Sequence, residues 1–234
     1  MPATHTGPTG RTPLSGLPPY ARRGTRPTVE RLLDPVERAI ALHDWVRDEI
    51  RFGWGPRFFE ETPAQTQRRR VGYSVTKSAA LVQAYRLEGL EARMVFAEID
   101  AEVLRGVLGP GPDMLDHAFV EVRLAGEWIA FDSHIVDTPL RRAAQRRLAA
   151  EGRHAGYGTH LQASGQFPNW SQFVPAARGR VWGSYSGAPA FLASGTRAHN
   201  RVSWLARRAF GAIASRANGR LDALRGIGSE APRD

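Results

Sequence analysis

Three polar residues in separate stretches of the chain have the side-chain chemistry of a nucleophile, a general base and an orienting acid. Ser74 stands at the start of a long apolar segment, His117 opens a stretch of alternating residues, and Asp132 closes the next such stretch. A hydroxyl, an imidazole and a carboxylate can together transfer an acyl group through a covalent intermediate. Whether these three can act together depends on the elements that carry them.

The segment from Ser74 to about Glu88 predicts a central helix. Its positions are apolar nearly all round, which is typical of a helix packed on several sides, and Gly89 follows as a C-terminal stop. A strand over residues 91–99 comes next. Ser74 also has a purely structural interpretation, because serine is a favoured residue at a helix N-cap.

The stretch from His117 to Asp132 predicts a β-hairpin that turns at residues 125–126. This register brings apolar residues opposite one another, Val120 with Phe131 and Val122 with Ile129. His117 then lies diagonally across from Asp132 on the same face, where Cα atoms are roughly 7–8 Å apart. The hairpin alone therefore predicts a histidine–aspartate pair.

Two helices are predicted around these blocks. Residues 32–52 predict a helix capped by Asp34, with Pro35 in its first turn and a buried stripe at helical spacing. Residues 197–225 predict a long amphipathic helix that docks its apolar side onto the domain, with Phe210, Ile213, Ala217 and Leu221 among the residues of that side.

The remaining stretches carry weaker signals. Residues 100–115 are rich in glycine and proline, which predicts a mobile connection able to act as a lid. Residues 138–152 predict a short basic helix, and residues 152–196 are interpreted as irregular. We expect residues 1–27 to form a disordered lead, residues 28–196 one domain, and residues 197–234 a C-terminal helix and tail.

Composition limits the partners and cofactors. The net charge of the 234-residue chain is +9 and its pI is about 11.0, but no nucleic-acid recognition motif accompanies the charge, so we expect no nucleic-acid partner. The chain has no cysteine, which excludes a disulfide framework and a thiolate metal site. No apolar run approaches the roughly 20 residues of a membrane span, and no signal peptide is recognisable, so a cytoplasmic location is the default expectation.

Three blocks of the sequence resemble the transglutaminase-like superfamily, which shares the papain-like cysteine-protease fold. They are "PVERAIALHDWVRDEIRF", "GYSVTKSAALVQAYRLEGLEARMVF" and "HAFVEVRLAGEWIAFD", in that family's order and over roughly residues 35–135. The resemblance implies an α+β fold in which a central nucleophile helix packs on an antiparallel β-sheet.

The resemblance also implies roles for individual residues. His117 matches the general base of the family, Asp132 matches the residue that orients it, and Ser74 falls where the family has its cysteine. Trp54 is a candidate indole donor to an oxyanion. We expect no cofactor and no metal, and a peptide, protein or small amide, ester or thioester as substrate; hydrolysis, transfer to an amine and the oligomeric state stay open.

Serine in place of cysteine leaves three interpretations open. Ser74 can be the nucleophile of a natural serine variant, which must lose its proton to His117 during attack because a hydroxyl is far harder to ionise than a thiol. It can be an engineered replacement of a cysteine. It can also mark a catalytically silent protein that binds a peptide or protein partner in its cleft.

Overall fold

The protein is described here by a computed structural model that covers residues 34–109, 111–170, 181–185, 188–194 and 204–227. The predicted lead over residues 1–27 lies outside the described residues. The elements in chain order are α1 (Pro35–Glu49), β1 (Arg51–Phe52), η1 (Phe58–Glu60), α2 (Pro63–Arg69), β2 (Val71–Gly72), α3 (Ser74–Leu87), β3 (Ala92–Asp100), η2 (Ala101–Leu104), β4 (Met114–Leu124), β5 (Glu127–Phe131), α4 (Thr138–Ala150), β6 (Ala155–Gly156), β7 (Thr159–His160), β8 (Val181–Tyr185), α5 (Ala188–Ala193) and α6 (Trp204–Arg225).

A four-stranded antiparallel sheet in the order β5-β4-β3-β8 forms the centre of the fold. The hairpin register is the predicted one, since Val120 pairs with Phe131 and Leu124 with Glu127. The turn residues Ala125 and Gly126 both have positive φ, 51° and 87°, as in the two-residue turns whose twist matches that of the flanking strands. The hairpin that carries the histidine and the aspartate is therefore fixed by local turn chemistry.

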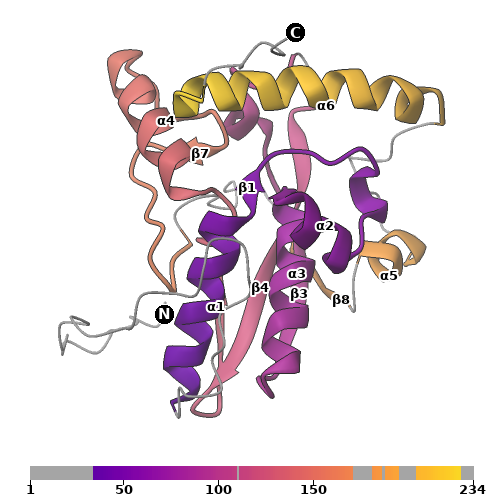
Figure 1. Cartoon of the computed structure of the whole chain (residues 1–234), viewed down its shortest axis with the longest axis vertical. Coiled ribbons are helices and arrows are strands. Elements are labelled where there is room, and N and C mark those ends of the chain that lie inside the picture. The colour runs from indigo at the N-terminus through magenta and orange to yellow at the C-terminus, as the bar shows by residue number, and fades with distance from the viewer. Residues whose placement is uncertain (1–33, 110, 171–180, 186–187, 195–203, 228–234) are drawn as a thin grey trace, which may run out of the picture.

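Helices α1 and α3 run side by side and cover one face of the sheet (Figure 1). Asp34 caps α1 by accepting a hydrogen bond from the Val36 backbone N–H, as predicted. The predicted stripe of α1 is buried, and α3 is buried along most of its length. Each large apolar side chain buried here stabilises the fold by about 1.5–3 kcal/mol. The α+β class and the central helix on an antiparallel sheet are confirmed.

The glycine-rich segment between β3 and β4 is more ordered than the prediction of a mobile connection. It begins with η2, and β4 starts already at Met114. Val103 and Val107 are buried, and the Arg220 guanidinium of α6 donates to the Val107 carbonyl oxygen. Two buried valines anchor this glycine-rich stretch, and its glycine and proline content had hidden that order from the sequence analysis.

The region after α4 contains elements that the sequence analysis missed. β6 and β7 form a small antiparallel pair, and β8 is the edge strand of the main sheet beside β3. β8 is short and contains a positive-φ glycine, Gly183, so its strand signal in the sequence is weak. Its strand conformation is supported by backbone pairing with β3, a contact distant in sequence.

Helix α6 lies across the ends of α1 and α3 (Figure 1). Its buried face contains Ala214, Ala217 and Leu221, whereas Ile213 is 49% exposed, so the predicted stripe was wrong at that position. The Arg225 guanidinium donates to both carboxylate oxygens of Asp137, and both side chains are almost completely buried. Docking onto the domain is thus confirmed for the described part of this helix. Within that same part of the chain, no helix combines the length and apolar character needed to cross a bilayer.

Candidate functional site

Ser74 is the first residue of α3, and the N-cap is Tyr73 rather than Ser74. The Thr76 hydroxyl accepts a hydrogen bond from the Tyr73 backbone N–H, which provides the capping interaction from inside the first turn. The Ser74 hydroxyl makes no hydrogen bond with another described residue, and Ser74 is 7% exposed. The structural interpretation of this serine as an N-cap is therefore wrong, and its hydroxyl is not committed to holding the helix.

The start of α3 is held in place by the loop that precedes it. β1 and β2 pair in parallel, and the Gly53 backbone N–H donates to the Gly72 carbonyl oxygen. This pairing sets residues 53–54 beside residues 72–73. The backbone N–H groups of a helix's first turn have no partner within the helix, and together with the helix dipole they favour negative charge. Ser74 therefore sits where a developing oxyanion can be stabilised.

His117 and Asp132 form the pair that the hairpin register predicted. His117 Nε2 lies 3.5 Å from Asp132 Oδ2, and both side chains are buried, with exposures of 1% and 0%. The backbone N–H of Asp132 donates to the carbonyl oxygen of Asn169, and Trp170 packs edge-on against Phe119 on the same face of β4. The aspartate is thus held from the side by a segment that follows β7.

The residue before His117 approaches the start of α3. Asp116 is buried, and its charge together with that of Glu61 adds to burial in raising the pKa of Tyr73 well above its usual range. Asp116 is therefore close enough to Tyr73 for its charge to act on the phenol. No hydrogen bond joins Ser74 to His117 in this structure. The structure links the three segments through Ser78, which contacts Ala118 and His134, and through the His117–Asp132 pair, but it forms no hydrogen bond between Ser74 and His117.

Trp54 has a clearer structural role than the one predicted for it. The side-chain amide of Asn218 on α6 accepts from the Trp54 backbone N–H and donates to its carbonyl oxygen, at 3.0 and 2.9 Å. The indole ring packs edge-on against Phe52 and is buried in the main core. A role of the indole as an oxyanion donor stays a prediction.

Two buried hydrogen-bonded groups lie behind the pair and were not assigned from the sequence. Ser78 Oγ lies 3.2 Å from the Ala118 carbonyl oxygen and 3.0 Å from His134 Nε2. His43 Nε2 lies 2.8 Å from Ser133 Oγ, and His43 Nδ1 lies 2.8 Å from Asp44 Oδ1. The one signal in the sequence was the four-residue spacing between Ser74 and Ser78, which puts both on one side of a helix.

Lys77, the single lysine of the chain, is fully buried on α3. Its ammonium donates to the carbonyl oxygens of Arg47 and Ile50, which belong to the end of α1. Burial lowers the pKa of Lys77 to about 7. Because carbonyl groups at a helix end lack partners within the helix, this side chain acts as a cap on α1 from a neighbouring helix.

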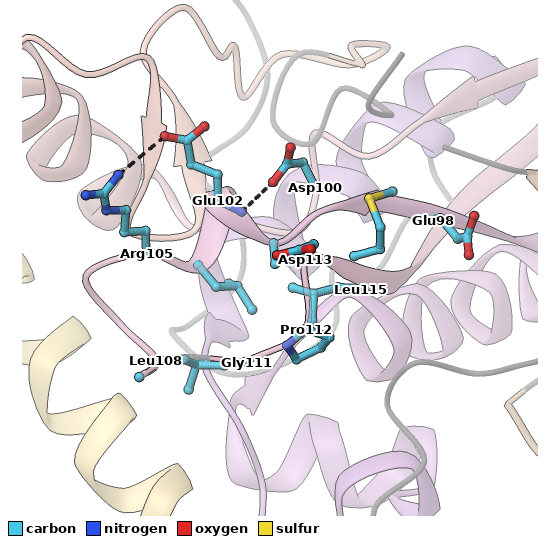
Figure 2. A pocket seen from close by; sticks show the side chains of 13 residues that line it. Glu98, Asp100, Glu102, Arg105, Leu108, Gly111, Pro112, Asp113 and Leu115 are labelled. Atoms are coloured by element: carbon cyan, nitrogen blue, oxygen red, sulfur yellow. Dashed lines mark hydrogen bonds and ion pairs between the residues drawn. The ribbon is translucent and has the colours of Figure 1, made fainter. Parts of the chain in front are cut away.

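A cavity of about 850 Å³ opens next to the start of β4. Its lining includes Met114 and Leu115, so it ends two residues before His117 along the strand. Figure 2 shows the acidic side chains that surround it, Glu98, Asp100, Glu102 and Asp113, with Arg105 paired to Glu102.

His160 of β7 is half-buried and is affected by charges from both the cavity and the pair. Burial lowers its pKa, while the charges of Asp132, Glu102 and Asp100 act in the opposite direction. Asp132 and two carboxylates of the cavity lining, Glu102 and Asp100, thus act on the same histidine. Within the described ranges, no three or more side chains among histidine, aspartate and glutamate are grouped so as to hold a metal ion.

Part of the chain is similar to known proteins. Residues 22–133 match the family model described as the transglutaminase-like superfamily, and this range includes Ser74, His117 and Asp132. A comparison with curated proteins finds no match. Among solved structures, a candidate cysteine protease from Cytophaga hutchinsonii is similar at 19% identity and a TM-score of 0.33, over 48% of this chain and 39% of that one.

Proposed function

From the match of residues 22–133 to the family model of the transglutaminase-like superfamily, we propose that the protein catalyses acyl transfer through an ester formed on Ser74. The observation that supports the proposal is the buried pair of His117 and Asp132, 3.5 Å apart. The residue after His117, Ala118, is in contact with Ser78 of the helix that begins with Ser74. The substrate is a peptide, protein or small molecule with an amide, ester or thioester bond.

In the first half of the reaction, Ser74 Oγ attacks the carbonyl carbon and its proton passes to His117. With Nε2 directed at Asp132, the nitrogen that takes the proton is Nδ1. The carbon–nitrogen, carbon–oxygen or carbon–sulfur bond of the substrate then breaks, and the imidazolium returns the proton to the leaving group. In the second half, His117 takes a proton from water or an amine, which attacks the ester carbonyl, and the imidazolium returns this proton to Ser74 Oγ as the ester carbon–oxygen bond breaks.

The carboxylate of Asp132 has two tasks in this scheme. Its charge, 3.5 Å from Nε2, favours the tautomer with the proton on Nε2, in which Nδ1 can act as a base, and it stabilises the imidazolium that forms. The backbone N–H groups at the start of α3, including that of Ser74, face the developing oxyanion. With serine as the nucleophile, the helix dipole does not ionise the group in advance, and the reaction depends on His117 more than it would with cysteine.

A second candidate function is a catalytically silent protein that binds a peptide or protein partner in the same cleft. It is favoured by one observation, the absence of a hydrogen bond between Ser74 and His117, which is the contact that a resting serine nucleophile uses. The two functions differ in whether any acyl group ever attaches to Ser74.

Intact-mass spectrometry after incubation with activated acyl donors, such as nitrophenyl esters with neutral, basic and acidic side chains, tests the proposal. We expect one added acyl mass per chain, located at Ser74 by peptide mapping, and its loss in Ser74→Ala. The matched control is Ser194→Ala, which removes an exposed serine hydroxyl at the end of α5 and should leave the mass shift unchanged.

Two results would redirect the proposal. Acylation of Ser74→Ala to the same extent would show that another group reacts. An unmodified wild type, together with a Ser74→Cys variant that gains acylation, would support the silent protein as the native state and show that the rest of the site is intact.

A further inference from the structure

Ser78 is placed to connect all three segments of the candidate site. It lies one helical turn after Ser74, and its side chain is completely buried. Its hydroxyl contacts the carbonyl oxygen of Ala118, the residue that follows His117, and the imidazole of His134, two residues after Asp132. The Ser78 Oγ atom therefore links α3, which begins with Ser74, to β4, which carries His117, and to the loop after β5 that carries Asp132.

The directions of the two hydrogen bonds of Ser78 follow from the protons that the Ser78 hydroxyl and the His134 imidazole can donate. The Ser78 hydroxyl has one proton, and His134 Nδ1 is buried without a hydrogen-bond partner in the described structure. A buried N–H without an acceptor is rarer and costlier than an unused lone pair, so the proton of His134 is on Nε2. His134 Nε2–H then donates to Ser78, and Ser78 donates to the Ala118 carbonyl oxygen. Burial lowers the pKa of His134 well below its usual range and keeps the ring in this neutral form.

The residue between Asp132 and His134 is fixed to the other helix. The Ser133 hydroxyl donates to His43 Nε2, and His43 Nδ1–H donates to Asp44 on α1. The Asp44 carboxylate also accepts from the Arg47 guanidinium, which in turn donates to the Gly165 carbonyl oxygen. The loop that carries the aspartate is thus held by α1 through Ser133 and by α3 through His134.

We infer that Ser78 is a positioning residue, which sets the place of the His117–Asp132 pair relative to Ser74 through its simultaneous bonds to Ala118 and His134. The inference rests on the proposed function for the meaning of that geometry. Its physical basis is that a displacement of about 1 Å in a reacting group can cost about 100-fold in rate. Ser78 itself is fully buried and does not touch the substrate.

The test compares Ser78→Ala with Leu148→Ala, a variant of a buried leucine on α4 whose side chain has no polar atom to join these hydrogen bonds. Thermal unfolding measures stability, and two further readouts measure geometry: the acylation rate constant at saturating donor, and the ¹⁵N shifts of the His117 ring, assigned by comparison with His117→Gln. We expect Ser78→Ala to lower the acylation rate about 10- to 100-fold and to move the His117 shifts. Leu148→Ala should lower only the unfolding temperature.

His134→Gln serves as the second variant if Ser78→Ala does not fold, and it should move the same His117 signals. Unchanged His117 shifts and an unchanged rate in the folded variants would overturn the inference and leave Ser78 as a residue of stability alone. If the wild type is never acylated but the His117 signals move, the proposed function fails while the positioning role stands. These two failures are therefore distinguishable.

Discussion

Two serine–histidine–aspartate sets lie a few residues apart in this fold, and the one with the better hydrogen bonds is the one that cannot react. Ser133, His43 and Asp44 are joined by contacts of 2.8 Å at both ends of the imidazole. In the candidate site, His117 and Asp132 are 3.5 Å apart and the Ser74 hydroxyl is not bonded to the ring. Connectivity alone would therefore select the wrong set.

Access and placement separate the two sets. Ser133 and His43 are completely buried, so no carbonyl carbon can approach the Ser133 hydroxyl. Ser74 is slightly exposed and opens a helix, where backbone N–H groups can receive an oxyanion. The comparison teaches that a complete hydrogen-bond chain in a core is a structural device, whereas a reacting site needs a hydroxyl with unused bonding capacity next to open space.

Replacing Ser74 and Ser133 separately with alanine gives the largest expected difference between the two sets. Ser74→Ala should abolish the acyl-enzyme, with a loss of about 1,000-fold or more in rate, because triad members act as a unit. Ser133→Ala should still be acylated at Ser74, with a lower unfolding temperature because His43 loses its donor. Intact-mass kinetics measure both, and a loss of acylation confined to Ser133→Ala would invert the comparison.

The two aspartates should differ in what they control. Asp132→Asn should lower the acylation rate by about 100-fold or more, because an amide can hold the His117 ring in the wrong tautomer. Asp44→Asn should leave the rate nearly unchanged and cost about 1 kcal/mol of unfolding free energy, since this carboxylate is partly exposed to solvent. Rate constants and urea unfolding of the two variants separate the effects. Equal losses of rate would remove the distinction between the two sets.

The chain has no cysteine, which makes a thiol comparison direct. Ser74→Cys should react with iodoacetamide with a thiol pKa below the usual value of about 8.5, because the helix start and His117 favour the thiolate. Ser133→Cys should react only after unfolding, and the exposed Ser194→Cys should show an ordinary pH profile. The labelling rate measured against pH gives the thiol pKa of each of the three variants. A thiol pKa of about 8.5 at residue 74 would argue against an activated position.

The hairpin and the central helix could be predicted from the sequence because their signals are local. The pairing of Val120 with Phe131 followed from alternation and a two-residue turn, and the distance between His117 and Asp132 followed from that register. The start of α3 at Ser74 was likewise visible, although the capping role passed to Tyr73 and Thr76.

The rest of the site could not be predicted because it depends on contacts between distant segments. The partners of Ser78 are 40 and 56 residues away in sequence, and the His43–Ser133 contact spans 90 residues. A lone serine or histidine on a buried helix face carries no information about which distant polar group will meet it. β8 was missed for the same reason, since its strand pairing with β3 is a long-range contact.

The two buried histidines behind the candidate site, His43 and His134, should also affect the pH dependence of stability, which is the smallest of the expected effects. Burial lowers the pKa of His43 and, more strongly, that of His134, so below pH 6.5 the unfolded chain binds protons that the folded chain resists. The unfolding free energy should therefore fall as the pH decreases from 7 to 5.5, by up to about 1.4 kcal/mol per pH unit for each such histidine. Urea unfolding across this range should show a shallower slope in His134→Gln than in the wild type. The difference between the two slopes isolates His134 from His160, whose pKa is also lowered. Identical slopes would mean that the ring of His134 accepts a proton in the folded state as readily as in the unfolded state, which contradicts the neutral donor assigned to it beside Ser78.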